Sequence, residues 1–223
     1  MRSEHVDRFN HDEDAPGYDL DVRNEADPIR AGYRDVLAWV ARQARPTPSS
    51  RVLELGSGTG NLTALLAPCR DLLCVDVSPA MTAIARDKLA ARSDVRWVLA
   101  DLLESLHPPH PSAAGLLDRV VSTYAIHHLT PDERAWLFEH LAGRLAPDGR
   151  IAVGDLMFAD QRARDDYVAA ARARGDVELA ETVEDEFFWI LDRELPRWIA
   201  AGLRVETRRL SELSWGVLAA PAG

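Results

Sequence analysis

Short apolar runs recur along most of the chain and are separated by segments with helical features. The runs are typical of buried strands. They fall at residues 51–55, 72–76, 95–100, 117–123 and 150–156. Strands that alternate with helices through short connections predict a parallel sheet with helices on both faces.

Capping residues mark where several helices start. Asp27 and Pro28 suit the N-cap and first position of a helix that ends before Pro46. Ser78 caps a second helix, and Thr130 opens a third with a capping-box sequence. Residues 61–66 predict one more short helix.

The two ends of the chain depart from this alternation. Residues 160–200 are largely helical in pattern, and 203–207 with 215–219 predict a final pair of strands. We therefore expect one domain over residues 29–223, with a helical insert at about 160–200. Residues 1–28 are acidic and predict a tail or a lid, for which Phe9 and Tyr18 are apolar anchors.

Charge and cysteine content narrow the function classes. The net charge of -10 argues against a nucleic-acid partner, because no continuous basic patch offsets it. Cys69 and Cys74 are five residues apart, which fits neither a zinc motif nor a disulfide framework. Without a signal peptide or a long apolar stretch, we expect a cytoplasmic protein with no membrane partner.

A glycine-rich loop follows the first predicted strand. The segment Val52-Leu-Glu-Leu-Gly-Ser-Gly-Thr-Gly-Asn61 places glycines at 56, 58 and 60. Glycines let the backbone approach a ligand closely. The next predicted helix begins after the loop, and the N–H groups at its start are free to bind a ligand. A dinucleotide fingerprint would need a glycine at position 61, which is Asn61.

Acidic residues end the next two predicted strands. Asp76 comes 20 residues after Gly56, where a carboxylate can accept hydrogen bonds from two ribose hydroxyls. Asp101 ends the third strand and can accept from an adenine amine. Either residue can instead merely cap its turn, but together with the loop they indicate a nucleoside site.

These motifs resemble those of class I S-adenosylmethionine-dependent methyltransferases. The matching stretches are E-L-G-S-G-T-G at 54–60, V-D-V-S at 75–78, A-D-L at 100–102 and L-A-P-D-G-R at 145–150. Residues 55–63 with 121–130 are similar to a bacterial subfamily of putative methyltransferases of this type. The resemblance implies a Rossmann-like sheet of seven strands, mostly parallel with an antiparallel last strand. It also implies S-adenosyl-L-methionine as cofactor and S-adenosyl-L-homocysteine as product.

The resemblance also implies which residues bind the cofactor. They are Gly56, Ser57, Gly58, Gly60, Asp76, Val77, Met81, Asp101, Leu102 and Thr123. For Met81, a place in the core of its helix is nearly as plausible as a place against the adenine.

Candidates for the acceptor side follow the fourth strand. His127, His128 and Tyr124 are predicted catalytic residues, although one imidazole can instead only hold the local loop together. Asp155 and Tyr18 are further candidates for the pocket and its lid. We expect no metal, because adjacent histidines rarely point at one ion.

The acceptor itself is predicted to be a small molecule. We expect the helical insert to cover its pocket, with Phe187, Phe188, Trp189 and Trp198 as core residues or as an apolar wall. Two alternatives stay open, namely a protein that binds S-adenosylmethionine without turnover and a protein methyltransferase. We expect a monomer or a homodimer.

Overall fold

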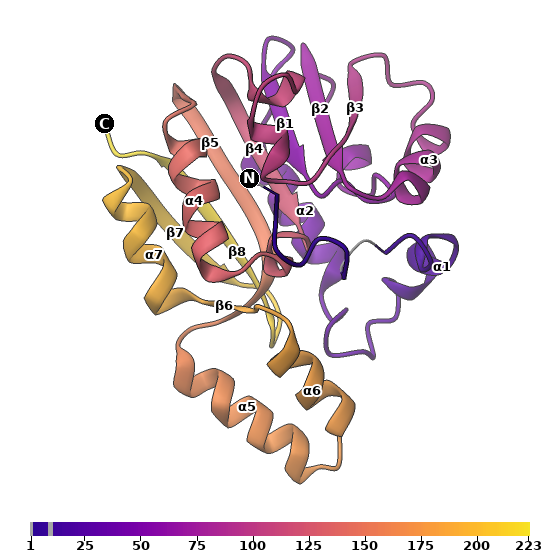
Figure 1. Cartoon of the computed structure of the whole chain (residues 1–223), viewed down its shortest axis with the longest axis vertical. Helices are drawn as coiled ribbons and strands as arrows, with labels where there is room; N and C mark the ends of the chain where they lie inside the picture. Colours follow the sequence, from indigo (N-terminus) through magenta and orange to yellow (C-terminus); the bar gives the residue numbers. More distant parts are fainter. Residues whose placement is uncertain (1, 9–10) are drawn as a thin grey trace.

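The computed structural model describes residues 2–8 and 11–223, so Phe9 lies outside the described residues. One mixed sheet runs through the molecule (Figure 1). Its strands are β1 (Arg51–Leu55), β2 (Asp71–Asp76), β3 (Val95–Leu99), β4 (Leu117–Thr123), β5 (Leu145–Phe158), β6 (Trp189–Ile190), β7 (Leu203–Arg209) and β8 (Ser214–Pro221). The order is β3-β2-β1-β4-β5-β8-β7, and the short β6 pairs with β5. Strands β1 to β5 are parallel and β8 is antiparallel to both neighbours, which confirms the predicted fold class.

Helices cover both faces of this sheet. They are α1 (Ala15–Asp21), α2 (Tyr33–Ala44), α3 (Pro79–Lys88), α4 (Pro131–Ala142), α5 (Gln161–Ala173), α6 (Val177–Asp185) and α7 (Leu191–Ala200), with 3-10 turns η1 (Thr63–Leu65), η2 (Glu104–Leu106), η3 (Pro111–Ala113) and η4 (Ile126–His128). Buried side chains of α2, α5 and α6 form one core, and those of α4 and α7 form a second. Because both faces are covered, β1 is buried along nearly all its length.

Helix α2 packs unusually close to the sheet at two glycines. A Cβ added to Gly154 would collide with Val36, and one added to Gly216 would collide with Trp39. Glycine at these positions lets the helix backbone approach β5 and β8, which brings the start of α2 to the carboxyl end of the sheet.

Local capping signals are partly confirmed. The Ser78 hydroxyl accepts from the Met81 N–H at 3.0 Å, and Thr130 forms the predicted capping box. The prediction that a helix begins at Pro28 was wrong. Helix α2 begins at Tyr33, after Gly32, whose φ is 79°. The Asp27 carboxylate instead accepts from the Ile29 N–H at 2.9 Å, which stabilises a turn. The segment 61–66 contains only the single turn η1.

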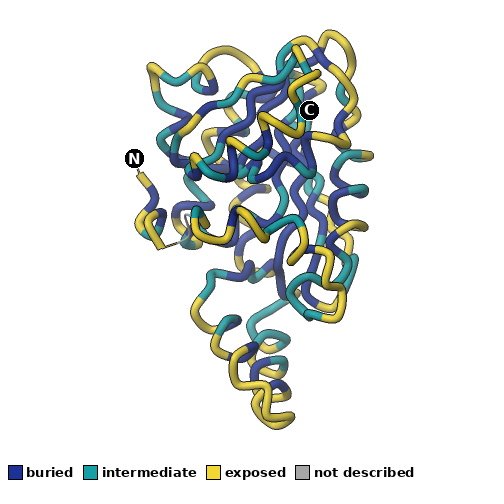
Figure 2. The backbone as a smooth tube through the Cα atoms, turned by 90° about the vertical axis from the view of Figure 1, so that its right-hand side faces the viewer, coloured by how far each residue is buried: buried dark blue, intermediate teal, exposed yellow. Residues whose placement is uncertain are grey.

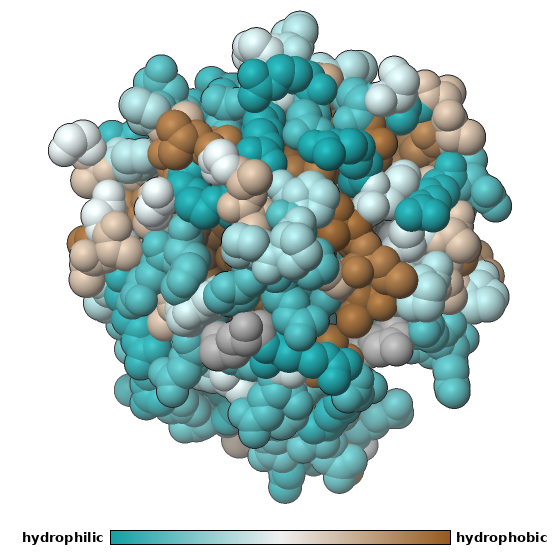
Figure 3. Space-filling model, turned by 45° about the horizontal axis from the view of Figure 1, so that its top comes forward, coloured by the Kyte–Doolittle hydropathy of each residue, from teal (hydrophilic) through white to brown (hydrophobic). Residues whose placement is uncertain are grey.

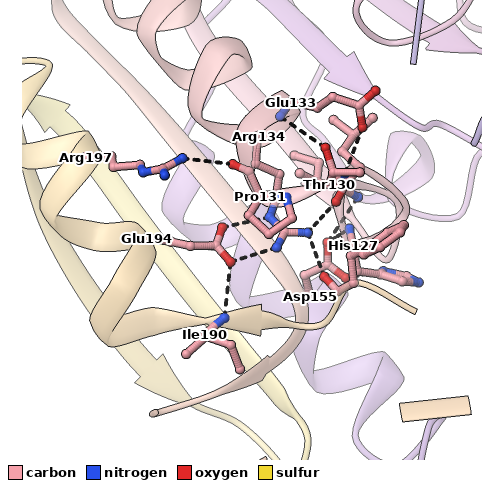
Figure 4. A network of polar contacts seen from close by, with 12 residues as sticks. His127, Thr130, Pro131, Glu133, Arg134, Asp155, Ile190, Glu194 and Arg197 are labelled. Carbon is pink, nitrogen blue, oxygen red and sulfur yellow. Dashed lines mark hydrogen bonds and ion pairs between the residues drawn. The ribbon is translucent and has the colours of Figure 1, made fainter. Parts of the chain in front are cut away.

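A buried ion pair joins α4 to α7, the last helix of the insert. Arg134 of α4 donates to both carboxylate oxygens of Glu194 of α7, each at 2.7 Å (Figure 4). It also donates to the backbone oxygens of Leu129 and Phe187. Both side chains are buried, so this network fixes where the chain returns from the insert.

The outer part of the insert, α5 and α6, extends beyond the carboxyl end of the sheet (Figure 1). Figure 2 shows many exposed residues along it, at the bottom of the view, and mainly buried residues in the body above it. Trp189 and Trp198 are fully buried against Phe138, so they are core residues. On the face shown in Figure 3, hydrophilic residues predominate and hydrophobic ones form small separate groups. Among the described residues, no helix has the length and apolar character needed to span a bilayer.

Candidate functional site

A cavity opens at the carboxyl ends of β1 to β4. Its volume is about 840 Å³, including the space at its open mouth. Strands β1 and β4 are neighbours, but the chain continues from β1 to β2 on one side of this pair and from β4 to β5 on the other. Ligands of open α/β folds bind at such a switch point. The cavity is therefore the candidate site.

The glycine loop forms one wall of this cavity. The N–H groups of Gly56 and Ser57 both donate to the Val75 oxygen, at 2.9 and 3.0 Å, which fixes the turn. Gly56 and Gly58 have φ of 67° and 51°, where a side chain is strained. A Cβ on Gly58 would meet no atom within 4 Å, so this residue borders open space.

Gly60 has a different place from the other two loop glycines. It does not line the cavity. A Cβ there would come within 2.9 Å of Leu89 and 3.2 Å of Ala85, so the glycine lets the loop pack on α3. Its prediction as a ligand-binding residue has no support in this placement.

Asp76 lines the cavity and is held in one orientation. Its two carboxylate oxygens accept from the N–H groups of Gly58, at 2.7 Å, and Ser78, at 2.9 Å. Burial raises the pKa of this carboxyl above its ordinary value. The two bonds use one lone pair on each oxygen and leave acceptor capacity toward the cavity.

Asp101 also lines the cavity but is more fully engaged. One oxygen accepts from the N–H groups of Leu103 and Glu104, at 2.9 and 3.1 Å. The N-terminal Ser3 adds its N–H at 3.2 Å and its hydroxyl at 2.7 Å. A ligand amine that approaches Asp101 therefore meets a carboxylate already oriented by Ser3.

Sequence reasoning missed the contribution of the N-terminal segment. Ser3, Val6 and His11 all line the cavity, as does the predicted Tyr18. No motif or periodicity marks these three residues. Their proximity to the site arises from folding of the acidic segment over the loop.

Two carboxylates anchor that segment. Asp12 accepts from the Ser78 hydroxyl at 2.5 Å and from the Ala80 N–H at 3.1 Å. Asp19 accepts from the side chains of Thr59 and Asn61, at 2.5 and 2.9 Å, and pairs with a lysine of α3 at 2.6 Å. Residues 12–19 thus lie against the body, and their opening as a lid stays a prediction.

Tyrosines form the wall opposite Asp101. The rings of Tyr33 and Tyr124 stack with centroids 5.2 Å apart, and the Tyr124 hydroxyl is 2.9 Å from the Ser214 hydroxyl. Tyr124 has a φ of 51°, a strained conformation for a non-glycine residue. Burial raises the pKa of both phenols, so they stay protonated at neutral pH.

The two adjacent histidines have different surroundings. His128 lines the cavity, and burial together with the neighbouring His127 lowers its pKa well below the ordinary value. His127 lies behind it and does not line the cavity. Its Nδ1 is 2.5 Å from Asp155 and its Nε2 is 3.5 Å from Glu186. Burial alone lowers the pKa of His127, but these carboxylates raise it overall.

Asp155 stabilises the turn η4, which carries the two histidines, and does not face the cavity. One oxygen accepts from the N–H groups of Ile126 and His127, at 3.1 and 3.0 Å. It is fully buried and absent from the cavity wall, so its prediction as a pocket residue is not supported.

The expectation that the insert covers the pocket was wrong. No residue of 160–200 lines the described cavity. Phe187 instead packs against the His5 ring, with centroids 5.1 Å apart, so the insert contacts the N-terminal segment. Helical spacing identifies the insert but not the surface on which it docks.

The remaining lining residues fit a nucleoside ligand. Val77, Met81 and Leu102 provide an apolar surface near the two acids, and Thr123 ends β4. The Ser57 hydroxyl is buried in this wall and has no hydrogen-bond partner among the residues that the structure describes. Because buried hydroxyls are normally paired, this atom indicates a polar ligand group.

Comparison with known proteins shows which family the chain resembles. Residues 52–149 match the model of a methyltransferase domain. The chain is 34% identical over 198 residues to an uncharacterized methyltransferase of Geobacillus kaustophilus, covering 86% of this chain and 85% of that protein. It is 32% identical over 185 residues to the uncharacterized methyltransferase YrrT of Bacillus subtilis, covering 82% of each.

Solved structures share the fold at lower identity. One is a complex titled DhpI-SAM-HEP, with a TM-score of 0.66, 20% identity and 97% of each chain covered. Another is the N-methyltransferase NodS from Bradyrhizobium japonicum with S-adenosyl-L-homocysteine, with a TM-score of 0.63, 18% identity, and 96% and 100% covered. Taken with the closer sequence relatives and the domain match, these findings place the chain in the methyltransferase family.

Proposed function

We propose that this methyltransferase transfers a methyl group from S-adenosyl-L-methionine to a small-molecule acceptor. The observation that carries the proposal is the joint placement of Gly58, Asp76 and Asp101 on one cavity wall. A glycine loop beside two oriented carboxylates matches the needs of a nucleoside that carries an amino acid.

Each predicted cofactor residue that lines the cavity receives a role in this proposal. Gly56, Ser57 and Gly58 bind the methionine part, and the Ser57 hydroxyl gains its missing partner there. Asp76 accepts from the ribose hydroxyls, which it can do while its bonds to the loop are kept. The adenine is flanked by Val77, Met81, Asp101 and Leu102.

The acceptor lies at the other end, beside Thr123 and the tyrosines. When bound, the cofactor supplies a methyl group on a sulfonium, which an aligned nucleophile can attack directly. Tyr124 and His128 border this end of the cavity. A neutral His128 can accept a proton from the acceptor, whereas the buried, protonated phenol of Tyr124 can take part only in hydrogen bonds. His127 acts as a positioning residue, since it holds the turn through Asp155.

A small molecule is favoured over a macromolecule by the closure of the cavity. Ser3, Val6, His11 and Tyr18 of the N-terminal segment line the cavity, and Asp12 and Asp19 anchor this segment to the body. A folded protein could not reach the acceptor end past this segment. The net charge of -10 further disfavours a nucleic acid.

Turnover distinguishes this proposal from its alternatives. The purified protein would be incubated with S-adenosylmethionine and a cell extract split by ultrafiltration into small molecules and macromolecules. We expect S-adenosylhomocysteine to form only with the small-molecule fraction. Product with the macromolecular fraction alone would indicate a protein methyltransferase, and no product with either fraction would indicate binding without turnover.

A further inference from the structure

Two imidazoles from distant parts of the chain meet at the acceptor end of the cavity. His11 comes from the N-terminal segment and His128 from η4, and both line the cavity. Their Nε2 atoms are 3.3 Å apart, and their ring centroids are 5.2 Å apart (interplanar angle 45°). The same nitrogen of each ring therefore faces the other residue.

These two distances match convergence on a metal ion. Two imidazole nitrogens at 2.0 to 2.1 Å from a tetrahedral zinc ion lie roughly 3.3 Å from each other, with ring centres roughly 5.2 Å apart. A straight N–H···N hydrogen bond of the same length would hold the ring centres roughly 5.6 Å apart. The observed centroid distance of 5.2 Å equals the value for zinc and not the longer value for a straight hydrogen bond. The two rings are therefore tilted, so that both nitrogens point to a common position beside the line that joins them.

The surroundings of His11 suit a cation, whereas Arg30 acts on His128 as a nearby positive charge. Asp14 lies 3.2 Å from the Nδ1 of His11, and metal-binding histidines usually have such a carboxylate on the other ring nitrogen. His11 has a φ of 43°, an uncommon conformation that presents its ring to the cavity. The Asp76 carboxylate is near enough to interact electrostatically with His11.

We propose that His11 and His128 bind a divalent transition-metal ion of the zinc type at the acceptor end of the cavity. No third protein ligand joins them within residues 2–8 and 11–223. Water and the acceptor fill the other positions, so the site selects acceptors with a hydroxyl or thiol that can bind the ion. When its Nε2 binds the ion, His128 no longer accepts the acceptor's proton. The ion instead lowers the pKa of that group, which loses its proton to solvent and so takes the nucleophilic form. This role in acceptor choice rests on the proposed methyl transfer.

Zinc binding alone tests the site. Metal-free wild type, His11→Ala and Asp14→Asn would be titrated calorimetrically with zinc chloride at neutral pH. The same three proteins would be titrated with Co²⁺, whose binding is followed by visible absorption. We expect one zinc site in the wild type, with affinity at least tenfold lower in His11→Ala. We expect Asp14→Asn to weaken binding by about tenfold.

The control is His140→Ala, which removes an imidazole on the surface of α4 away from the cavity. It should keep wild-type zinc affinity. Equal zinc affinity in His11→Ala and the wild type, or no zinc binding by the wild type, would overturn the inference. Titration of metal-free wild type with S-adenosylmethionine is the separate check, because its failure would count against the proposed function and not against the metal site.

Discussion

The carboxyl group of Glu54 is buried in the sheet directly before the glycine loop. It accepts from the Thr63 hydroxyl at 2.8 Å and from the Cys74 thiol at 3.5 Å, and no basic side chain pairs with it within residues 2–8 and 11–223. Burial raises its pKa from 4.5 to about 7. The folded protein therefore holds this proton more tightly than the unfolded chain, and the contribution of Glu54 to stability falls as pH rises from 4.5 to 7.

The size of the effect follows from the two pKa values. Above pH 7 the ionised Glu54 costs about 3.4 kcal/mol, since the difference of 2.5 units is multiplied by about 1.36 kcal/mol. At pH 5 the cost is only about 0.8 kcal/mol, because most of the group is still protonated in the folded state. Glu54→Gln removes this titration but keeps a similar shape and a polar group.

Urea unfolding of both proteins at pH 5 and pH 8 measures the difference. We expect the free energy of unfolding of Glu54→Gln, relative to wild type, to rise by about 2.5 kcal/mol between these pH values. Other titrating groups are common to both proteins and cancel. A relative stability that stays constant within about 0.5 kcal/mol, or that falls with pH, would refute the reasoning.

Three further predictions concern stability, each measured by urea unfolding. Arg134→Met should lower the free energy of unfolding by about 3–5 kcal/mol because it leaves a buried carboxylate unpaired. Arg197→Met, at an exposed ion pair, should lower it by less than about 1 kcal/mol, and similar losses would contradict the role given to burial. Thr130→Ala should cost about 1 kcal/mol by removing the capping box, and no loss would show that the cap is dispensable. Gly154→Ala should cost about 1–3 kcal/mol by collision with α2, but Gly17→Ala, with open space around it, should be neutral or slightly stabilising; the reverse order would contradict the packing.

Features set by local chemistry could be predicted from the sequence. The positive φ angles of Gly56 and Gly58 favour glycine, and acids at the carboxyl ends of parallel strands lie at one edge of the sheet. That is why the sequence located the loop, Asp76 and Asp101 correctly. The Ser78 and Thr130 caps were predictable for the same reason, since each acts within one turn of its own helix.

Features set by tertiary contacts could not be predicted in this way. Ser3 and His11 reach the cavity because carboxylates of the N-terminal segment bond to groups on the loop and α3, far along the chain. The signals at Asp27 and Pro28 indicated a helix start, but Gly32 in the left-handed region ends that turn before α2 begins. The position of the insert depends on the buried pair between α4 and α7, which spacing alone does not reveal.

Binding of the cofactor is the most direct test of the central claim, that the loop and Asp76 form a site for S-adenosylmethionine. Wild type, Asp76→Asn and the exposed control Asp132→Asn would be titrated by calorimetry with S-adenosylmethionine and, separately, with NAD. We expect binding of S-adenosylmethionine but not NAD, weakened at least tenfold in Asp76→Asn, which corresponds to about 1.4 kcal/mol, and unchanged in Asp132→Asn. No binding of S-adenosylmethionine, or equal binding by Asp76→Asn and wild type, would contradict the account.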